Sequence, residues 1–208
     1  MLTVHHLNNS RSQRVLWLLE ELGLEYQIAN YQRDADTNLA PPELLAVHPL
    51  GKSPVLTDGD NTVIESGAII DYIVRRHGDG RLAPEPGTGA YEAYLQWMHY
   101  SEGSAMLPLM LKMYVGRLPD GGEALQPRIN SELDNHLGYM NQALEGAEWF
   151  VENTFSAADI QLSFVPQVAS MLYGLDKFPN LAAFLDRIHA RDAYKRAIEK
   201  GGRYDFGS

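Results

Sequence analysis

Two short stretches of the chain combine residue types that can hold a small polar ligand. Gly51-Lys52-Ser53-Pro54 leads into the apolar run Val55-Leu56, and Glu65-Ser66 opens a helical pattern further along. Proline cannot donate to a sheet ladder, so we expect Pro54 at the start of a strand, after a Ser53–Pro54 bond that is a candidate for the cis form. A cis bend would turn the main-chain N–H and C=O of Ser53 outward, and the unpaired N–H groups of a helix start favour an anion. These features together predict a pocket for a short acidic peptide.

Composition narrows the possible partners and chemistry. The 208 residues suit one large domain or two small ones, and 17 Lys and Arg against 27 Asp and Glu give a net charge of −10. This charge argues against nucleic acid or an anionic membrane as partner. There is no cysteine, so the chain has no disulfide, thiolate metal site or thiol nucleophile, and a ligand must bring any reactive sulfur.

The sequence also argues against a membrane or metal role. No apolar run reaches membrane-spanning length, and the N-terminus lacks the apolar core of a secretory signal, so we expect a cytoplasmic protein. The adjacent His5 and His6 fall on a predicted strand, where neighbouring side chains point to opposite faces. They cannot easily chelate together, and we predict no metal site.

The first part of the chain shows a mixed pattern of strands and helices. Residues 2–7 predict a strand, and from Ser12 the apolar residues recur on one helix face, with Gly23 as a C-cap. Residues 24–30 predict a second strand, which makes the opening a parallel βαβ unit. The remaining elements predicted here are a short helix at 42–47, strands at 54–56 and 62–64 around a hairpin turn at Asp58–Asn61, and a helix at 66–77.

The second part reads as helical throughout. A glycine- and proline-rich stretch at 78–88 separates the two parts. We therefore expect an α/β domain over residues 1–80, a linker over 81–88 and an all-helical bundle over 89–208. Its helices are expected at 91–114, 124–144, 156–172, near 179–190 and near 192–200.

A sharp folding signal lies inside the predicted bundle. Ser156 and Asp159 have the spacing of a capping box, and Phe155 and Ile160 that of a hydrophobic staple. We interpret this as a contribution to stability and not as a functional site. Replacing Asp159 by alanine should cost about 0.5–2 kcal/mol.

The ordered set of motifs resembles the glutathione transferase family over essentially the whole chain. Ser-Pro entering a strand, Glu-Ser opening the next helix, the Gly/Pro linker and the capped helix of a helical domain carry the resemblance. It implies a thioredoxin-like N-terminal domain that binds glutathione, an all-helical domain that binds a hydrophobic electrophile, and a homodimer.

The resemblance implies a serine-type thiol site. Ser10 stands four residues before Arg14, which matches the catalytic serine of such members, and Asn9 and Ser12 are competing donors in the same loop. A hydroxyl that donates to the glutathione sulfur favours the thiolate. From the residues alone, an ordinary helix N-cap is an equally good interpretation of Ser10. No tyrosine precedes Tyr26, which excludes the tyrosine mechanism.

The remaining glutathione contacts are also implied by the resemblance. Ser53, bent by Pro54, would pair its main chain with the cysteinyl unit. Glu65 and Ser66 would hold the γ-glutamyl end, although Ser66 also fits an N-cap. Two further candidates are less sharply marked: Lys52 as partner of the glycine carboxylate and Glu102 as an acidic residue near the ammonium of the glutathione in the neighbouring subunit.

A wall for the electrophile is expected in the first long helix of the bundle. Tyr100, Met106 and Met110 are candidates, because methionine suits an adaptable apolar surface, although bundle core is the favoured interpretation of the methionine spacing. We predict a glutathione transferase that activates the glutathione thiol for attack on a hydrophobic electrophile. The alternatives are a glutathione-dependent peroxidase or disulfide reductase and a binding protein with little turnover.

Overall fold

The computed structural model describes residues 1–206 and divides the chain into two compact units. The first unit comprises residues 1–82 together with the chain from His189 onward, and the second unit comprises residues 83–188. The C-terminal segment therefore packs with the α/β part, whereas the sequence placed it in the helical domain.

A four-stranded mixed sheet forms the centre of the first unit. Its strands are β1 (Leu2–Leu7), β2 (Tyr26–Tyr31), β3 (Val55–Asp58) and β4 (Asn61–Ile64), in the order β2-β1-β3-β4. β1 and β2 are parallel, while β3 runs antiparallel to both β1 and β4. The predicted βαβ opening and the hairpin at Asp58–Asn61 are confirmed.

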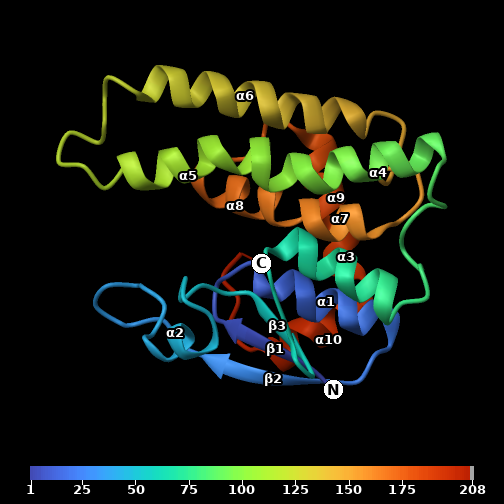
Figure 1. Ribbon diagram of the computed structural model, residues 1–208. Coiled ribbons are helices and arrows are strands. Elements are labelled where there is room, and N and C mark those ends of the chain that lie inside the picture. The colour runs from blue at the N-terminus through green and yellow to red at the C-terminus, as the bar shows by residue number, and fades with distance from the viewer. Residues whose placement is uncertain (207–208) are drawn as a thin grey trace. The chain divides into compact units, whose positions relative to one another are not determined.

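Two helices bury the apolar side of the sheet. α1 (Ser12–Leu22) packs on β1, α3 (Ser66–Arg76) packs on β3 and β4, and the two helices contact each other. Figure 1 shows them on the same side of the strands, with the short α2 (Glu43–Val47) set apart from them. α1 ends at Gly23, whose φ of 64° is the left-handed C-cap conformation that glycine adopts without a steric penalty.

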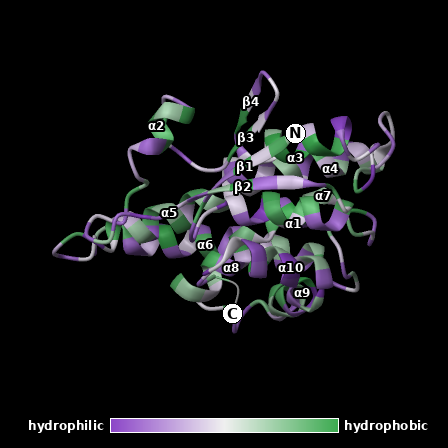
Figure 2. Cartoon of the chain, turned by 90° about the horizontal axis from the view of Figure 1, so that it is seen from below, coloured by the Kyte–Doolittle hydropathy of each residue, from purple (hydrophilic) through white to green (hydrophobic). Residues whose placement is uncertain are grey.

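The last helix of the chain, α10 (Asp192–Gly201), is attached to α1 by charged groups. Arg191 donates to both carboxylate oxygens of Glu21, at 2.6 and 2.9 Å, while Arg196 and Lys200 donate to Glu20. Burial alone would raise the pKa of Glu20, but the hydrogen bonds from Lys200, Tyr26 and Arg196 lower it on balance. α10 also packs on α1 through apolar groups, since the ring of the buried Tyr194 lies edge-on to that of Trp17 with centroids 5.2 Å apart. Figure 2 shows the hydrophilic residues of α10.

The second unit is helical, with α5 and α6 side by side (Figure 1). Its elements are α4 (Gly89–Tyr100), a π-helical segment η1 (Ser101–Ala105), α5 (Met106–Val115), α6 (Gln126–Ala143), α7 (Ala157–Leu162), α8 (Phe164–Leu172) and α9 (Pro179–Ala190). Among the described residues, no helix is both long enough and apolar enough to cross a membrane.

Two helices that were predicted to be continuous are interrupted upstream of a proline. The helix expected at 91–114 widens into η1 before Pro108, and the helix expected at 156–172 breaks at Ser163 before Pro166. A proline ring clashes with the carbonyl group four residues earlier in a regular helix. Widening or breaking the preceding turn relieves that clash.

Candidate functional site

The loop between β1 and α1 holds a buried chain of side-chain hydrogen bonds. Ser10 Oγ lies 2.7 Å from Ser12 Oγ, which lies 2.8 Å from His6 Nδ1. His6 Nε2 lies 3.0 Å from the main-chain oxygen of Gly201, at the end of α10. All three side chains are buried, Ser10 being 6% exposed. We call this set the Ser10–Ser12–His6 chain.

Ser10 makes a capping contact at the start of α1. The N-cap residue is Arg11, and it makes no side-chain cap hydrogen bond. Ser10 Oγ does accept a hydrogen bond of 3.2 Å from the Ser12 N–H, which tightens the loop before the helix. Ser10 therefore satisfies a first-turn N–H of α1, as a capping residue does, and the same oxygen lies 2.7 Å from Ser12 Oγ.

Asn9 and Asp205 bind each other through both ends of the asparagine side chain. Asn9 Nδ2 donates to Asp205 Oδ2 at 2.7 Å, and Asn9 Oδ1 accepts from the Asp205 N–H at 2.8 Å. Asn9 also adopts a left-handed backbone with φ of 51°. Of the three donors predicted for this loop, Asn9 is thus engaged by the C-terminal segment and Ser12 by His6.

The Ser53–Pro54 bond is cis, as the sequence indicated, and Pro54 directly precedes β3. The Ser53 side chain completes the pairing with β1, because its hydroxyl donates to the His5 carbonyl at 2.8 Å and accepts from the Leu7 N–H at 3.2 Å. The main-chain N–H and C=O of Ser53 have no partner among the described residues. They form the free strand edge that an extended peptide can pair with.

The start of α3 combines an unusual backbone with a buried hydroxyl. Glu65, the exposed N-cap residue, has a φ of 67°, which costs energy for a residue other than glycine. Ser66 is the first helical residue, and its buried Oγ accepts a hydrogen bond of 2.9 Å from Nη2 of the buried Arg14. Ser66 is therefore not the N-cap, and its hydroxyl ties α3 to α1. The predicted partner Lys52 is exposed.

The candidates for an electrophile wall all lie in the second unit. Tyr100 ends α4 and Met106 begins α5, and Glu102, the predicted partner of the glutathione ammonium, lies between them in η1. Tyr100 Oη lies 2.7 Å from His136 Nδ1, and burial raises the pKa of Tyr100, which keeps its hydroxyl protonated. Met106 is 2% exposed, which fits bundle core, whereas Met110 is only half-buried.

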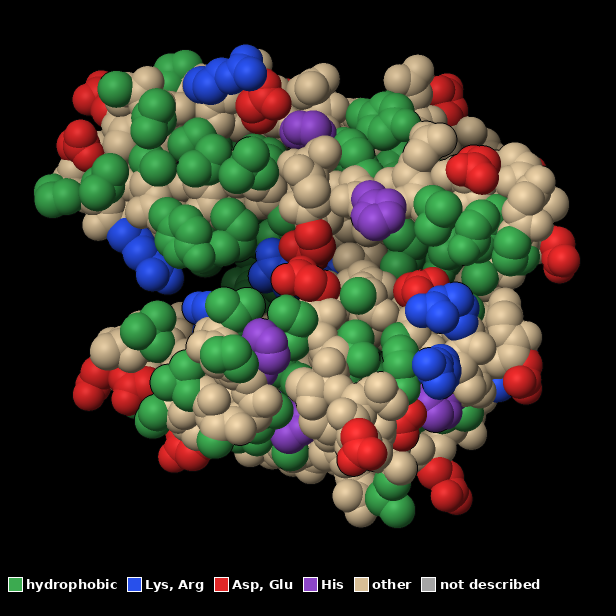
Figure 3. Space-filling view, in the orientation of Figure 1, with side chains coloured by type: hydrophobic (Ala, Val, Ile, Leu, Met, Phe, Trp, Pro, Cys, Tyr) green, Lys and Arg blue, Asp and Glu red, His purple; other side chains and the backbone are tan. Residues whose placement is uncertain are grey.

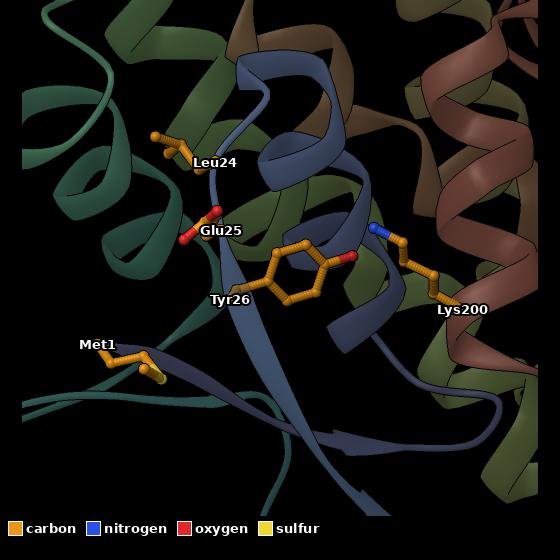
Figure 4. Close-up of a pocket in the computed structure, with 5 residues that line it drawn as sticks. All are labelled: Met1, Leu24, Glu25, Tyr26 and Lys200. Atoms are coloured by element: carbon orange, nitrogen blue, oxygen red, sulfur yellow. The ribbon is translucent and has the colours of Figure 1, made fainter.

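A shallow pocket elsewhere in the first unit contains none of the predicted site residues. Its volume is about 420 Å³, and Figure 4 shows its lining residues, which are Met1, Leu24, Glu25, Tyr26 and Lys200. It lies where β1 and β2 begin, whereas the Ser10 loop follows the ends of these parallel strands. Among residues 1–206, no cluster of His, Asp and Glu side chains could hold a metal ion.

The sequence did not predict three residues that bond to the loop between β1 and α1 or to its hydrogen-bond chain, namely His6, Gly201 and Asp205. His6 was considered only together with His5, as a metal ligand that the strand geometry disfavours. No local pattern marks Gly201 or Asp205, because they reach the loop through the packing of a helix that was assigned to the other domain.

Comparison with known proteins identifies the family. The family model "Glutathione S-transferase, N-terminal domain" matches residues 1–75, and "Glutathione S-transferase, C-terminal domain" matches residues 115–200. Glutathione S-transferase 3 of Schizosaccharomyces pombe is 33% identical over 216 residues, covering 96% of this chain and 88% of its own. The chain belongs to the glutathione S-transferase family.

Two further relatives agree with this assignment. The glutathione S-transferase 1 of Saccharomyces cerevisiae is 29% identical over 223 residues, covering 96% of this chain and 95% of its own. The crystal structure of a glutathione S-transferase from Actinobacillus pleuropneumoniae is 36% identical, with a TM-score of 0.87 over 99% of this chain and 95% of that one. The predicted fold class, a thioredoxin-like α/β domain followed by a helical domain, is confirmed.

Proposed function

We propose that this member of the glutathione S-transferase family is a serine-type transferase. Ser10 holds the sulfur of bound glutathione, and the thiolate attacks a small hydrophobic electrophile. The observation that carries the proposal is that the Leu7 N–H lies 3.3 Å from Ser12 Oγ and 3.2 Å from Ser53 Oγ, which brings the loop of the buried Ser10 next to the free main chain of Ser53. The relatives named above extend over nearly the whole chain, which supports transferase chemistry in general.

The tripeptide is held by main-chain groups and by the start of α3. The free N–H and C=O of Ser53 pair with the cysteinyl unit as an added strand. Glu65 attracts the γ-glutamyl ammonium, and Ser66 with the first N–H groups of α3 binds the γ-glutamyl carboxylate. Lys52 faces the glycine carboxylate, and Glu102 of a partner subunit supports the ammonium.

Ser10 acts by favouring the ionised sulfur. A free thiol has a pKa of about 8.5, and lowering it by about two units requires roughly 2.7 kcal/mol of preferential stabilisation of the thiolate. A hydroxyl donor and the nearby helix start each supply part of this. The thiolate then forms the new carbon–sulfur bond as the leaving group departs. Tyr100 and Met110 of the second unit are our candidates for contact with the electrophile, whereas Met106 is buried in the bundle core.

The test is the variant Ser10→Ala with a model aryl halide. We expect kcat near neutral pH to fall about 10- to 100-fold, as one to two units of lost acidity imply, while the affinity for glutathione changes little. The control is Ser131→Ala, an exposed serine of α6. Wild-type kinetics in Ser10→Ala would contradict the proposal and would move the role to Asn9 or Ser12.

An assay panel tests the reaction type. Retention on immobilised glutathione, followed by assays with an aryl halide, a hydroperoxide and a mixed disulfide, separates a transferase from a peroxidase or reductase. Absence of retention would favour a binding protein without glutathione chemistry.

We also propose a cytoplasmic homodimer. Figure 3 shows hydrophobic side chains gathered over α5 and α6. Leu107, Leu111 and Tyr114 of α5 are 58%, 41% and 55% exposed, which is a suitable surface for a second copy. Sedimentation of the purified protein tests this, and a monomer at micromolar concentration would contradict it.

A further inference from the structure

The positions of the hydrogens in the Ser10–Ser12–His6 chain follow from the bond between His6 and Gly201 at one end of it. The main-chain oxygen of Gly201 can only accept, so His6 Nε2, 3.0 Å away, carries a hydrogen. Burial lowers the pKa of His6, against the opposing effect of the Gly201 hydrogen bond, so the ring is neutral near pH 7. His6 Nδ1 is therefore an acceptor.

The two serines then have only one possible direction. A bare ring nitrogen cannot donate, so Ser12 donates its single hydrogen to His6 Nδ1 at 2.8 Å, which is closer than its other acceptor, the Leu7 carbonyl at 3.3 Å. Ser12 has no second hydrogen for the contact of 2.7 Å with Ser10, so Ser10 donates there. Without ligand, the Ser10 hydrogen points to Ser12, and a lone pair of Ser10 Oγ remains for a ligand.

With its hydrogen pointing to Ser12, Ser10 Oγ can accept a hydrogen bond from a thiol but cannot donate one to a thiolate. A thiol can donate its S–H to the lone pair of Ser10. A thiolate needs the hydrogen of Ser10, which must first leave Ser12. Two other contacts survive that rotation, because the Ser12 N–H still donates to Ser10 Oγ at 3.2 Å and the Leu7 N–H still donates to Ser12 Oγ at 3.3 Å.

We propose that Ser12 and His6 are positioning residues that compete with the glutathione sulfur for the hydrogen of Ser10, and so set how readily the bound thiol ionises. The proposal rests on the proposed function, because it takes Ser10 as the donor to sulfur. The anchor of the competition is the Gly201 carbonyl, so the last turn of α10 takes part in the chemistry of the loop.

The decisive experiment is a titration of bound glutathione in Ser12→Ala, followed by the ultraviolet absorbance of the thiolate. Removing Ser12 destabilises only the state in which Ser10 donates inward. We expect the pKa of the bound thiol to fall by about half a unit to one unit, the equivalent of one neutral hydrogen bond. A purely structural role would raise this pKa or weaken glutathione binding instead. An unchanged or higher pKa overturns the proposal.

A second variant decides the question if Ser12→Ala does not fold. A Cβ added at Gly201 would lie 2.7 Å from Gln13 Oε1, 2.9 Å from Leu16 Cδ1 and 3.3 Å from His6 Nε2. Gly201→Ala therefore displaces His6 from its anchor and should shift the thiol pKa downward as well. Gly138→Ala in α6 is the matched control, since nothing lies within 4 Å of its added Cβ. No downward shift in Gly201→Ala then overturns the proposal.

Ser10→Ala separates this inference from the proposed function. If its bound thiol pKa rises toward about 8.5 while Ser12→Ala shows no fall, only the competition is wrong. If Ser10→Ala titrates like the wild type, the assignment of Ser10 itself fails, and the competition fails with it.

Discussion

The starts of α1 and α7 both carry buried serines and use them in different ways. At α7, Ser156 is the N-cap, and its pairing with Asp159 is a complete capping box, in which the Asp159 carboxylate accepts the Ser156 N–H at 2.8 Å. At α1, the N-cap is Arg11, and the hydroxyls of Ser10 and Ser12 bond to each other and to His6.

The two starts contrast a serine that only caps its helix with one that we propose acts on a ligand. Ser10 and Ser156 are both buried serines directly before a helix, and each of these properties favours a cap. At both starts the serine oxygen contacts its own helix. The difference is that at α1 the contacts continue through Ser12 to His6 of β1. Ser66 at α3 belongs with the second kind, since its partner is Arg14 of α1.

The largest expected effect sharpens the stability side of this comparison. Asp159 is fully buried, and its Oδ1 also accepts from the Phe150 N–H at 3.0 Å. Asp159→Ala should therefore lower the free energy of unfolding by about 2–4 kcal/mol, through the lost cap and an unpaired buried N–H. Denaturant unfolding measures this effect.

Activity supplies the control for that experiment. The specific activity of the folded Asp159→Ala protein at low temperature should equal that of the wild type, because the box only stabilises α7. A selective loss of activity in folded protein would break the distinction between the two helix starts.

Ser66→Ala should affect stability and binding together. The variant removes a hydrogen-bond partner from the buried, charged Arg14, which should cost about 1.5–3 kcal/mol of stability. If Ser66 also holds the γ-glutamyl carboxylate, the Kd for glutathione should rise about tenfold or more. Calorimetry on the folded variant measures the second effect, and Ser131→Ala is the control for both. An unchanged Kd would show that Ser66 only joins α3 to α1 through its hydrogen bond with Arg14.

The fold could be predicted from the sequence where local chemistry decides it. The period of the apolar residues in α1, Gly23 at its end and the Ser156–Asp159 spacing are local signals, and the structure contains each of them. The interrupted helices were missed because Pro108 and Pro166 act on the turn before them, and apolar periodicity does not record that effect.

The site was less predictable because it depends on contacts distant in sequence. Ser10 was predicted through its spacing to Arg14, but the bonds from His6 to Gly201 and from Asn9 to Asp205 join residues near the two ends of the chain. Such pairs require knowledge of where α10 packs. The polar contacts of Glu20 and Glu21 that hold α10 have no periodic signature in the sequence.

Gln13→Leu tests whether the polar groups around α1 are optimised for stability. Gln13 is 2% exposed, and neither its Nε2 nor its Oε1 has a hydrogen-bond partner among the described residues. A buried unpaired polar group costs about 1–3 kcal/mol, so the leucine variant should be about 1–2 kcal/mol more stable. Gln142→Leu, at an exposed position of α6, should not gain stability. Destabilisation by Gln13→Leu would show that the amide is satisfied, for instance by a buried water.

The smallest effect is the pH dependence of the cap at α7. Burial raises the pKa of Asp159 to about 6, against hydrogen bonds from Phe150 and Ser156 that favour the carboxylate. Because the folded-state pKa lies above that of the unfolded chain, at about 3.9, the folded state binds the proton more tightly. This contribution to stability is complete below the unfolded-state value and is lost as the pH rises through about 6. Lowering the pH from 7 to 5 should therefore stabilise the wild type by about 1 kcal/mol, as measured by urea unfolding at each pH. Asp159→Asn has no proton to bind and should lack this gain, and an equal gain in both proteins would assign the titration to another group.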